Sequence, residues 1–260
     1  MVYFIGAGPG DVELITVKGM KLLQQADIVI YAGSLVNSEL LAYCKKDVRI
    51  YDSASMDFTA VMEAIQQGAD KDMLIVRLHT GDPSIYGTIK EQMDELDRRG
   101  IAYEIVPGVS SFLAAASRIK AEFTLPGVSQ TVIITRLEGR TGRGEGGKLE
   151  ELVKHRASMA IFLSVQALDK VVEILKTGYG ENAPIAVVYK ATWPDEKIVK
   201  GTLADIVEKV KKENIDRFAQ ILVGDFINTG YEMSRLYAAD FSHGFRSAAQ
   251  SDEAAGSKKR

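Results

Sequence analysis

The sequence has little of several features that would define a specialised class of protein. It contains one cysteine, Cys44, so no internal disulfide can form and a reducing compartment is expected. No apolar run approaches the roughly 18 residues of a transmembrane helix, and the N-terminus shows no signal-peptide pattern. The net charge of -3 gives no general support for nucleic-acid binding. We therefore expect a cytoplasmic protein that binds neither membranes nor nucleic acid.

Metal-ligating residues are scarce as well. The three histidines, His79, His155 and His243, are dispersed along the chain. Together with one cysteine they form no spacing typical of a metal site. We therefore expect that the protein itself holds no metal.

What the sequence does contain is an alternation of short apolar runs and amphipathic segments. In the first half, strands are predicted over 2–5, 27–31, 48–51, 73–78 and 103–106. Helices are predicted between them, including segments over 38–44 and 84–99. This alternation is typical of an α/β fold with a mostly parallel, doubly wound sheet.

The second half contains more candidate hairpins, including an antiparallel strand expected over 197–202, so a mixed sheet is predicted there. A segment rich in Pro, Gly and Ser near 124–129 marks a boundary. We expect an N-terminal α/β domain over 1–125 and a C-terminal α/β domain over 126–246. Residues 247–260 lack aromatic and branched aliphatic side chains and are predicted to be a disordered tail.

Three predicted strands of the first half end in loops rich in Gly, Pro or Ser: 6–11, 80–87 and 107–112. The carboxyl ends of parallel strands meet at one edge of a sheet, where α/β proteins bind ligands. In the middle loop, Gly81 lacks the Cβ that would block a close approach, and Pro83 restricts the backbone. That loop alone fits a simple turn equally well, but three such loops together favour a cleft.

The first loop, GAGPGD at 6–11, invites comparison with the dinucleotide-binding fingerprint. That fingerprint needs a third glycine that opens a helix, and Asp11 occupies this position. We place the start of the helix later, with Thr16 as its N-cap. The loop is therefore interpreted as a tight turn or as a ligand loop of another kind. The Gly-rich segment 139–147 lacks the Lys-Ser/Thr ending of a phosphate-binding loop.

The segments GAGPGD at 6–11, RLHTGDPSIYG at 77–87 and VPGVSS at 106–111, in this order and at this spacing, resemble the tetrapyrrole methylases. The resemblance extends to about Arg246. It implies a class III methyltransferase of two α/β domains that binds S-adenosyl-L-methionine in the cleft between them and releases S-adenosyl-L-homocysteine. It also implies a homodimer and a small-molecule tetrapyrrole substrate.

Three further segments refine the resemblance: YAGSLV at 31–36, LPGVSQTVIITRLEGRT at 125–141 and FSHGFR at 241–246. They are similar to the branch of the family that methylates ring carbon C-11 of precorrin-4 or cobalt-precorrin-4 in cobalamin biosynthesis. Relatives that act on uroporphyrinogen typically read GGDPF in the middle loop, where this chain reads TGDPS. Rival interpretations are diphthine synthase, another precorrin methylase, an NAD-dependent oxidoreductase and a non-catalytic binding module.

By position, the resemblance implies a set of cofactor-contacting residues in the loops and at strand ends. These are Pro9, Thr80, Gly81, Asp82, Ile85, Ser110, Ser111, Phe112, Leu163, Ala191 and Leu222. Small residues and backbone polar groups suit a cofactor that combines a sulfonium, an amino-acid tail and an adenosine. Leu163 often corresponds to Met in relatives, and either residue leaves an apolar wall.

The sulfonium is already activated, so alignment of the reacting atoms supplies much of the catalysis. We expect no single side chain to perform the chemistry. The ionisable groups nearest the predicted cleft are Asp11 and Asp82, both of which could be structural, with Asp11 capping the following turn.

A tetrapyrrole carries carboxylates, so cationic partners are expected. The candidates are Arg77, Lys90, Arg118, Lys120, Arg136, Arg140 and Arg143. We select Arg118, Arg136 and Arg140 as substrate-binding residues. Arg136 and the 139–147 loop are the preferred pair, because they follow a strand end in the second domain.

Overall fold

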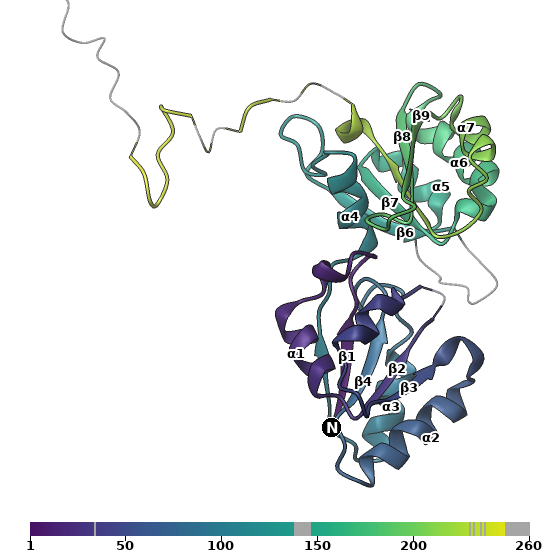
Figure 1. The fold of residues 1–260 in the computed structure, drawn as a ribbon. Coiled ribbons are helices and arrows are strands. Elements are labelled where there is room, and N and C mark those ends of the chain that lie inside the picture. The colour runs from purple at the N-terminus through teal and green to yellow at the C-terminus, as the bar shows by residue number, and fades with distance from the viewer. Residues whose placement is uncertain are drawn as a thin grey trace, which may run out of the picture.

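The structure, a computed structural model, describes residues 1–33, 35–137, 147–228, 230, 232–234, 236 and 238–247. They form two lobes, each built on its own five-stranded sheet (Figure 1). The tail predicted from 247 onward lies outside the described residues except for its first position. In the described part of the chain, no helix has the length and apolar character needed to cross a membrane.

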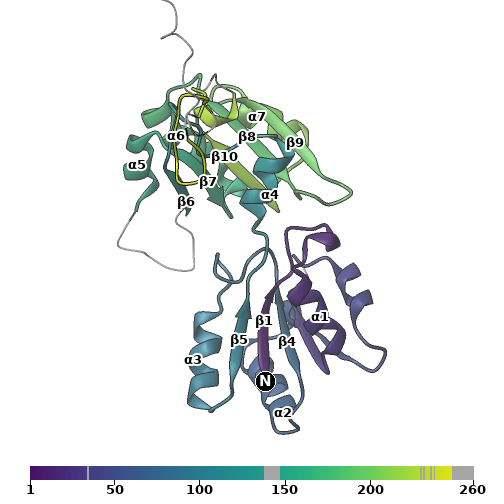
Figure 2. The same ribbon diagram turned by 90° about the vertical axis from the view of Figure 1, so that its left-hand side faces the viewer.

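The first lobe contains a fully parallel sheet with the strand order β3-β2-β4-β1-β5. Its strands are β1 (Val2–Gly6), β2 (Ile28–Tyr31), β3 (Arg49–Asp52), β4 (Ile75–His79) and β5 (Tyr103–Val106). The parallel sheet predicted from the alternating pattern is confirmed. Because the strands run in one direction, their carboxyl ends share one edge, which faces the second lobe (Figure 2).

Helices cover both faces of this sheet. Helix α1 (Val17–Gln25) packs on the face that includes Ile5, whereas α2 (Phe58–Ala69) and α3 (Lys90–Arg98) cover the face that includes Phe4. Successive side chains of a strand point to opposite faces, so Phe4 and Ile5 enter separate cores. Thr16 caps α1 as predicted, because its Oγ1 accepts a hydrogen bond from the Gly19 amide at 3.1 Å.

Two helices of the first lobe differ from the sequence prediction. The helix expected over 84–99 begins only at Lys90, because Tyr86 and Thr88 adopt left-handed φ angles of 55° and 52°, which a helix cannot include. The helix expected over 38–44 is a 3₁₀ segment, η2 (Ser38–Tyr43). Two shorter 3₁₀ segments, η1 (Val12–Leu14) and η3 (Ser53–Ser55), follow the ends of β1 and β3.

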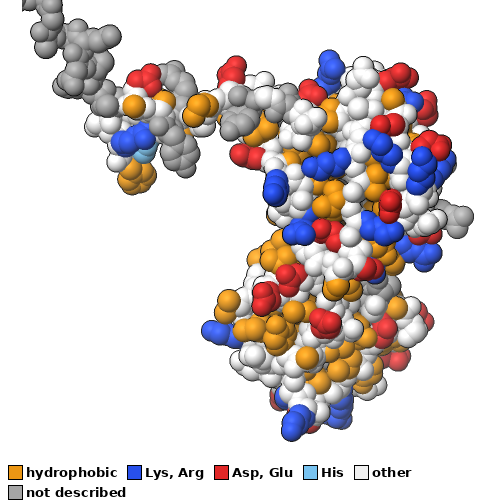
Figure 3. Space-filling model, turned by 45° about the horizontal axis from the view of Figure 1, so that its top comes forward, with side chains coloured by type: hydrophobic (Ala, Val, Ile, Leu, Met, Phe, Trp, Pro, Cys, Tyr) orange, Lys and Arg blue, Asp and Glu red, His pale blue; other side chains and the backbone are white. Residues whose placement is uncertain are grey.

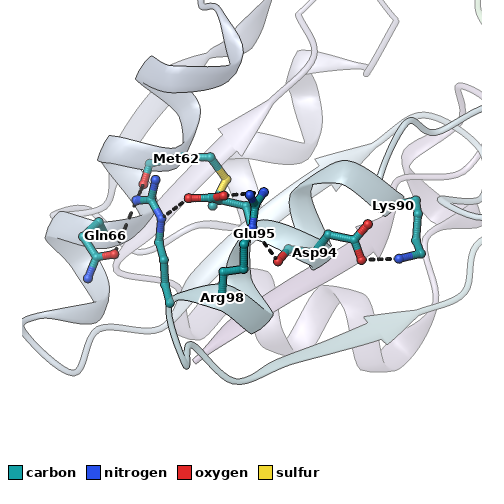
Figure 4. A network of polar contacts seen from close by, with 7 residues as sticks. Met62, Gln66, Lys90, Asp94, Glu95 and Arg98 are labelled. Atoms are coloured by element: carbon teal, nitrogen blue, oxygen red, sulfur yellow. Dashed lines mark hydrogen bonds and ion pairs between the residues drawn. The ribbon is translucent and has the colours of Figure 1, made fainter.

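A polar network holds α3 against α2 (Figure 4). The Arg99 Nε donates to Glu95 Oε1 at 2.6 Å, and its Nη1 donates to the Met62 carbonyl of α2 at 3.3 Å. Arg98 also pairs with Glu95, at 2.6 Å. Exposed ion pairs add little stability individually. Helix α3 also carries Gln92, which is buried.

The second lobe contains the mixed sheet predicted from its candidate hairpins. Its order is β6-β7-β10-β8-β9, in which β6 and β7 are parallel and the other neighbours are antiparallel. The strands are β6 (Val132–Arg136), β7 (Ser158–Phe162), β8 (Pro184–Tyr189), β9 (Lys197–Thr202) and β10 (Ala219–Val223). The antiparallel strand predicted over 197–202 is therefore confirmed as β9.

One face of the second sheet packs against α5 (Leu149–Leu152), α6 (Leu168–Tyr179) and α7 (Ile206–Lys212). The 3₁₀ segments η4 (Val153–His155), η5 (Val165–Ala167) and η6 (Asp225–Ile227) complete this lobe. The other face packs against α4 (Ser111–Arg118), whose Ala114 and Ala115 contact a core that includes Ala186 and Leu222. Helix α4 precedes the boundary expected at 125, yet it packs with the second sheet (Figure 2). We propose that the structural division lies near residue 110.

Charges of both signs cover the surface. On the face shown in Figure 3, basic and acidic side chains are intermixed over the second lobe. Oppositely charged side chains of the second lobe also form ion pairs, such as Lys190–Asp195 at 2.6 Å and Lys209–Asp205 at 2.7 Å. Nucleic-acid binding uses basic residues gathered on one surface, and the described residues on this face form no such continuous area.

Candidate active site

A cleft of about 710 Å³ lies where the two lobes meet, and both lobes contribute its walls. From the first lobe and the crossing to α4, the lining residues include Pro9, Leu35, Thr80, Gly81, Asp82, Ile85, Tyr86, Ser110 and Ser111. From the second lobe they include Phe162, Leu163, Gln166, Lys190, Ala191, Trp193, Arg217, Phe218 and Gln220. The cleft is therefore built from the carboxyl edge of the first sheet and the loops of the second.

The three loops at the edge of the first sheet converge, as the sequence predicted. The Gly81 amide donates to the Gly8 carbonyl at 2.8 Å, and the Gly8 amide donates back to the Gly81 carbonyl at 3.3 Å. A Cβ on Gly108 would lie 2.2 Å from the Gly81 carbonyl oxygen and 2.7 Å from the Gly6 Cα. Only glycine fits this close backbone approach, so the loops after β1, β4 and β5 form one unit.

Asp82 ties two of these loops together. Its Oδ1 accepts from the Ser84 amide and its Oδ2 from the Gly108 amide, both at 2.8 Å. Burial acts to raise the pKa of Asp82, but these hydrogen bonds and one from the Ser84 hydroxyl outweigh it, so the pKa lies below its usual value. Both carboxylate oxygens therefore accept hydrogen bonds, so Asp82 has a structural role that links the two loops.

The other acidic candidate, Asp11, also has a structural position. Its Oδ1 accepts from the Glu13 amide at 2.9 Å and caps η1, as expected for a residue at a turn. Its own amide donates to the Thr192 Oγ1 of the second lobe at 3.0 Å. Asp11 is not one of the described residues that line the cleft.

Trp193 joins the lobes at the rim of the cleft. Its indole Nε1 donates to the Pro9 carbonyl at 2.9 Å, and its ring lies against Gly10, where a Cβ would approach the Trp193 Cδ1 to 2.1 Å. The Lys190 ammonium lies 5.2 Å from the Trp193 ring centroid, a distance that permits a cation–π interaction. The first loop is thereby fixed to the loop after β8.

Polar and strained groups form the second-lobe side of the cleft. The Ser111 Oγ donates to Gln220 Oε1 at 3.2 Å, and the Gln220 Nε2 donates to the Ile161 carbonyl at 3.0 Å. On this second-lobe side, four non-glycine residues at or beside the cleft have left-handed φ angles: Leu163 (51°), Lys190 (45°), Thr192 (73°) and Phe218 (54°). Residues with strained backbone are often found at functional sites. Here they lie just after β7 and β8 and just before β10.

The structure brings together most of the cofactor-contacting residues that the sequence predicted. Those that line the cleft are Pro9, Thr80, Gly81, Asp82, Ile85, Ser110, Ser111, Leu163 and Ala191. Phe112 does not line it, because its ring packs 5.7 Å from Phe123 and 6.2 Å from Phe162 between ring centroids. Leu222 is fully buried beneath α4 and also does not line the cleft. For these two residues, cofactor contact stays a prediction.

The predicted substrate-binding arginines separate into three cases. The Arg136 guanidinium lies 5.6 Å from the ring centroid of Tyr86, which lines the cleft, so it is close to the rim. Arg118 instead forms a double contact with Glu196, its Nε lying 2.9 Å from both carboxylate oxygens, and does not line the cleft. Substrate binding by Arg118 stays a prediction. Arg140 lies outside the described residues.

Sequence reasoning missed several lining residues, notably Leu35, Gln166, Arg217, Phe218 and Gln220. Gln220 could have been found, because it is the polar residue within the apolar run of a predicted buried strand. Gln166 lies in η5 and the others lie in loops, where no local pattern distinguishes a lining residue from a solvated one. Among the described residues, no group of His, Cys, Asp and Glu could hold a metal ion.

Two α/β lobes with a cleft at the carboxyl edge of the first sheet describe a two-lobed α/β protein whose cleft has the position of a small-molecule site. The chain matches the family described as Tetrapyrrole (Corrin/Porphyrin) Methylases over residues 1–207. A relative from Methanocaldococcus jannaschii named cobalt-precorrin-4 C(11)-methyltransferase is 56% identical over 247 residues, covering 94% of this chain and 95% of the relative. The chain belongs to the tetrapyrrole methylase family, as its motifs predicted.

Solved structures agree with this membership. The X-ray structure of a cobalt precorrin-4 methyltransferase has a TM-score of 0.85 and 47% identity, covering 88% of this chain and 96% of that one. The uroporphyrin-III C-methyl transferase of Thermus thermophilus, solved with S-adenosyl homocysteine, has a TM-score of 0.72 and 27% identity, covering 87% and 93%. The predicted fold class is therefore confirmed.

Proposed function

We propose that this protein transfers a methyl group from S-adenosyl-L-methionine to ring carbon C-11 of precorrin-4, in its cobalt form, during cobalamin biosynthesis. The products are the corresponding precorrin-5 compound and S-adenosyl-L-homocysteine. The observation that carries the proposal is the cleft: nine residues that family motifs assign to the cofactor line one cavity between the lobes. The cobalt form is favoured because the relative at 56% identity and the structure at 47% identity are both named for it.

The residues of the cleft fit the cofactor. A volume of about 710 Å³ is within the range of small-molecule sites. Gly81 and Ala191 place little side-chain bulk at the cleft wall, the Ser110 and Ser111 hydroxyls add polar groups, and Leu163, 66% exposed, offers an apolar wall. We propose that Pro9, Thr80, Asp82 and Ile85 complete this binding surface.

When bound, the cofactor supplies an electrophilic methyl group on a sulfonium. The chain's part is to hold the acceptor carbon in line with that methyl group, and positioning alone lowers a barrier substantially. Asp11 and Asp82 are engaged by backbone amides, so we assign them positioning roles. We propose that the electron-rich macrocycle provides the nucleophilic carbon itself and that no side chain acts as a general base.

We further propose a homodimer in the cytoplasm. The family resemblance supports the dimer, and the single cysteine, Cys44, supports a reducing compartment. The outer strands β5 and β6 each expose an isoleucine, Ile105 at 40% and Ile134 at 37%, so apolar surface is present at two sheet edges. Light scattering coupled to gel filtration tests the dimer, and a monomeric mass at micromolar concentration would refute it.

The experiment that tests the activity begins with calorimetric titration of S-adenosyl-L-homocysteine, with NADH in parallel. We expect binding of the first and no response to the second. Cobalt-precorrin-4 and ¹³C-methyl-labelled cofactor are then incubated with the enzyme, and NMR of the product is expected to place the label at C-11. A label at another ring carbon would reassign the position of methylation. Binding without transfer to any tetrapyrrole would overturn the proposed substrate.

A further inference from the structure

A second cavity, of about 300 Å³, opens in the first lobe beside the cleft. Leu35, Thr80, Ile85 and Tyr86 line both cavities, so the two spaces are neighbours. The remaining walls come from the end of β4 and from the starts of α2 and α3. They include Met56, Asp57, Phe58, Val61, Arg77, His79, Glu91 and Gln92. We refer to this space as the Arg77–His79 cavity.

Arg77 is a buried cation whose partners are all neutral. Its side chain is 7% exposed, its Nε donates to Gln92 Oε1 at 3.3 Å, and its Nη1 donates to the Ile30 carbonyl at 3.2 Å. No carboxylate of the described residues forms an ion pair with it. Burial lowers the pKa of Arg77 to about 10, so the guanidinium remains charged at neutral pH.

His79 lies on the same face of β4, two residues along the strand. It is 6% exposed, and its Nε2 has no hydrogen-bond partner among the described residues. Burial, together with the charge of Arg77, lowers the pKa of His79 to about 3, so the ring is neutral and carries one N–H donor. Phe4 packs near it, with ring centroids 5.9 Å apart.

A buried charge without a counterion destabilises a fold, as does a buried polar atom without a partner. Apolar residues at positions 77 and 79 would avoid both costs. The two acids on the cavity wall do not resolve this imbalance, because Asp57 accepts from the Ala60 amide as the cap of α2 and Glu91 is exposed in the first turn of α3. An anion from outside the chain would supply the missing partner.

The walls indicate what kind of anion fits. Met56, Phe58, Val61 and Ile85 supply apolar surface, whereas Arg77 and His79 supply a cation and a neutral polar ring. A carboxylate on a short hydrocarbon stem matches this combination, since its charged end pairs with a guanidinium and its stem packs on apolar side chains. The neighbouring cleft would hold the remainder of such a molecule.

We propose that the Arg77–His79 cavity is a subsite that receives one carboxylate side chain of the tetrapyrrole substrate and so orients the macrocycle beside the methyl donor. This inference rests on the proposed function, because it takes the substrate from it. Arg77 supplies the ion pair, and His79 lies beside it as a hydrogen-bond donor. Both side chains reach the subsite from one strand, so the loop that follows at Thr80 and Gly81 fixes its position relative to the cleft.

The first test compares Arg77→Met with Arg98→Met, which removes the same charge from an exposed position on α3. For Arg77→Met we expect KM for cobalt-precorrin-4 to rise about 10- to 100-fold, as for loss of a charge-assisted hydrogen bond. We expect affinity for S-adenosyl-L-homocysteine to be unchanged and Tm to be unchanged or higher. Arg98→Met should leave all three values near those of the wild type. A lowered Tm with unchanged KM would show that Arg77 is structural and overturn the subsite.

The second test does not depend on methyl transfer. Sodium propionate serves as the probe, and ¹⁵N NMR of the three histidine rings serves as the readout, with sodium chloride as the ionic-strength control. We expect a saturable shift of the His79 resonance alone, lost in Arg77→Met. An absence of saturation would overturn the subsite. A saturable shift in an enzyme that methylates no precorrin would retain the subsite and refute the proposed function.

Discussion

The indole N–H of Trp193 in the second lobe donates to the carbonyl of Pro9 in the first lobe across 2.9 Å. This bond fixes the loop after β1 to the loop after β8 at the rim of the cleft. Trp193 is the chain's one tryptophan, so its fluorescence reports on this junction alone. We expect its emission to change when S-adenosyl-L-homocysteine fills the cleft.

Replacing Trp193 with Phe should weaken binding of S-adenosyl-L-homocysteine about 2- to 10-fold, the equivalent of one hydrogen bond. The phenyl ring retains packing on Gly10, but the link that pre-positions the lobes is lost. Calorimetric titration measures the effect. Tyr179→Phe is the matched control, because it removes a 2.6 Å bond to the Ala157 carbonyl away from the cleft. Equal loss of affinity in both variants would refute a specific role for Trp193.

Replacing Gly108 with Ala should lower the free energy of unfolding by about 3 kcal/mol, as for severe overpacking. The new Cβ would meet the Gly81 carbonyl oxygen at 2.2 Å, and this oxygen belongs to backbone that cannot rotate away. Urea unfolding measures the loss. Gly244→Ala provides the comparison, since a Cβ there meets nothing within 4 Å. A Gly108→Ala protein as stable as the wild type would show that the three loops do not form a close-packed unit.

Asp82→Asn should reduce stability at pH 7 by about 1–3 kcal/mol, because one charge-assisted backbone contact is lost. The folded-state pKa of Asp82 is lowered, so its contribution is present above the ordinary value of 3.8 and is lost as pH falls through the folded-state pKa. The difference between variant and wild type should therefore shrink below pH 3.8. Urea unfolding across this range measures it. Asp169→Asn, which affects an exposed contact with Lys211 at 3.3 Å, should show a much smaller difference at pH 7.

The convergence of the three loops could be predicted from the sequence, because the turns that contain their glycines are visible in the local residue types. Gly8 and Gly81 adopt left-handed φ angles of 78° and 60° at strand ends, where turn chemistry is visible in the residue types. The parallel direction of the strands in the first sheet could be predicted, because continuous apolar strands alternate with helices along the sequence. The N-cap role of Thr16 was equally local.

Other features depend on contacts that no local pattern contains. Arg118 pairs with Glu196, which lies 78 residues away, so this ion pair could not be anticipated from a local pattern. The late start of α3 depends on left-handed Thr88, a residue type that ordinarily favours extended or helical backbone. Leu222 lies within β10 and Ala191 follows β8, and both are buried in the core that includes α4, yet only Ala191 lines the cleft.

Leu163→Gly should separate stability from binding. Leu163 is 66% exposed and has φ of 51°, so a glycine relieves backbone strain of about 1–2 kcal/mol while adding unfolded-state entropy of about the same size. We therefore expect Tm to change little. The apolar wall is lost, and affinity for S-adenosyl-L-homocysteine should fall about 10-fold, as for a buried aliphatic side chain of about 1.5 kcal/mol.

Arg156→Gly is the matched control for Leu163→Gly, because Arg156 has nearly the same φ, 50°, at the end of η4, away from the cleft. It should show a similarly small change in Tm and no change in affinity. Calorimetry with S-adenosyl-L-homocysteine and thermal unfolding of both variants decide the matter. If Leu163→Gly lowers Tm by much more than Arg156→Gly does, the Leu163 side chain contributes to the stability of the fold. If only affinity falls, the strained backbone is maintained because it presents an apolar side chain to the ligand.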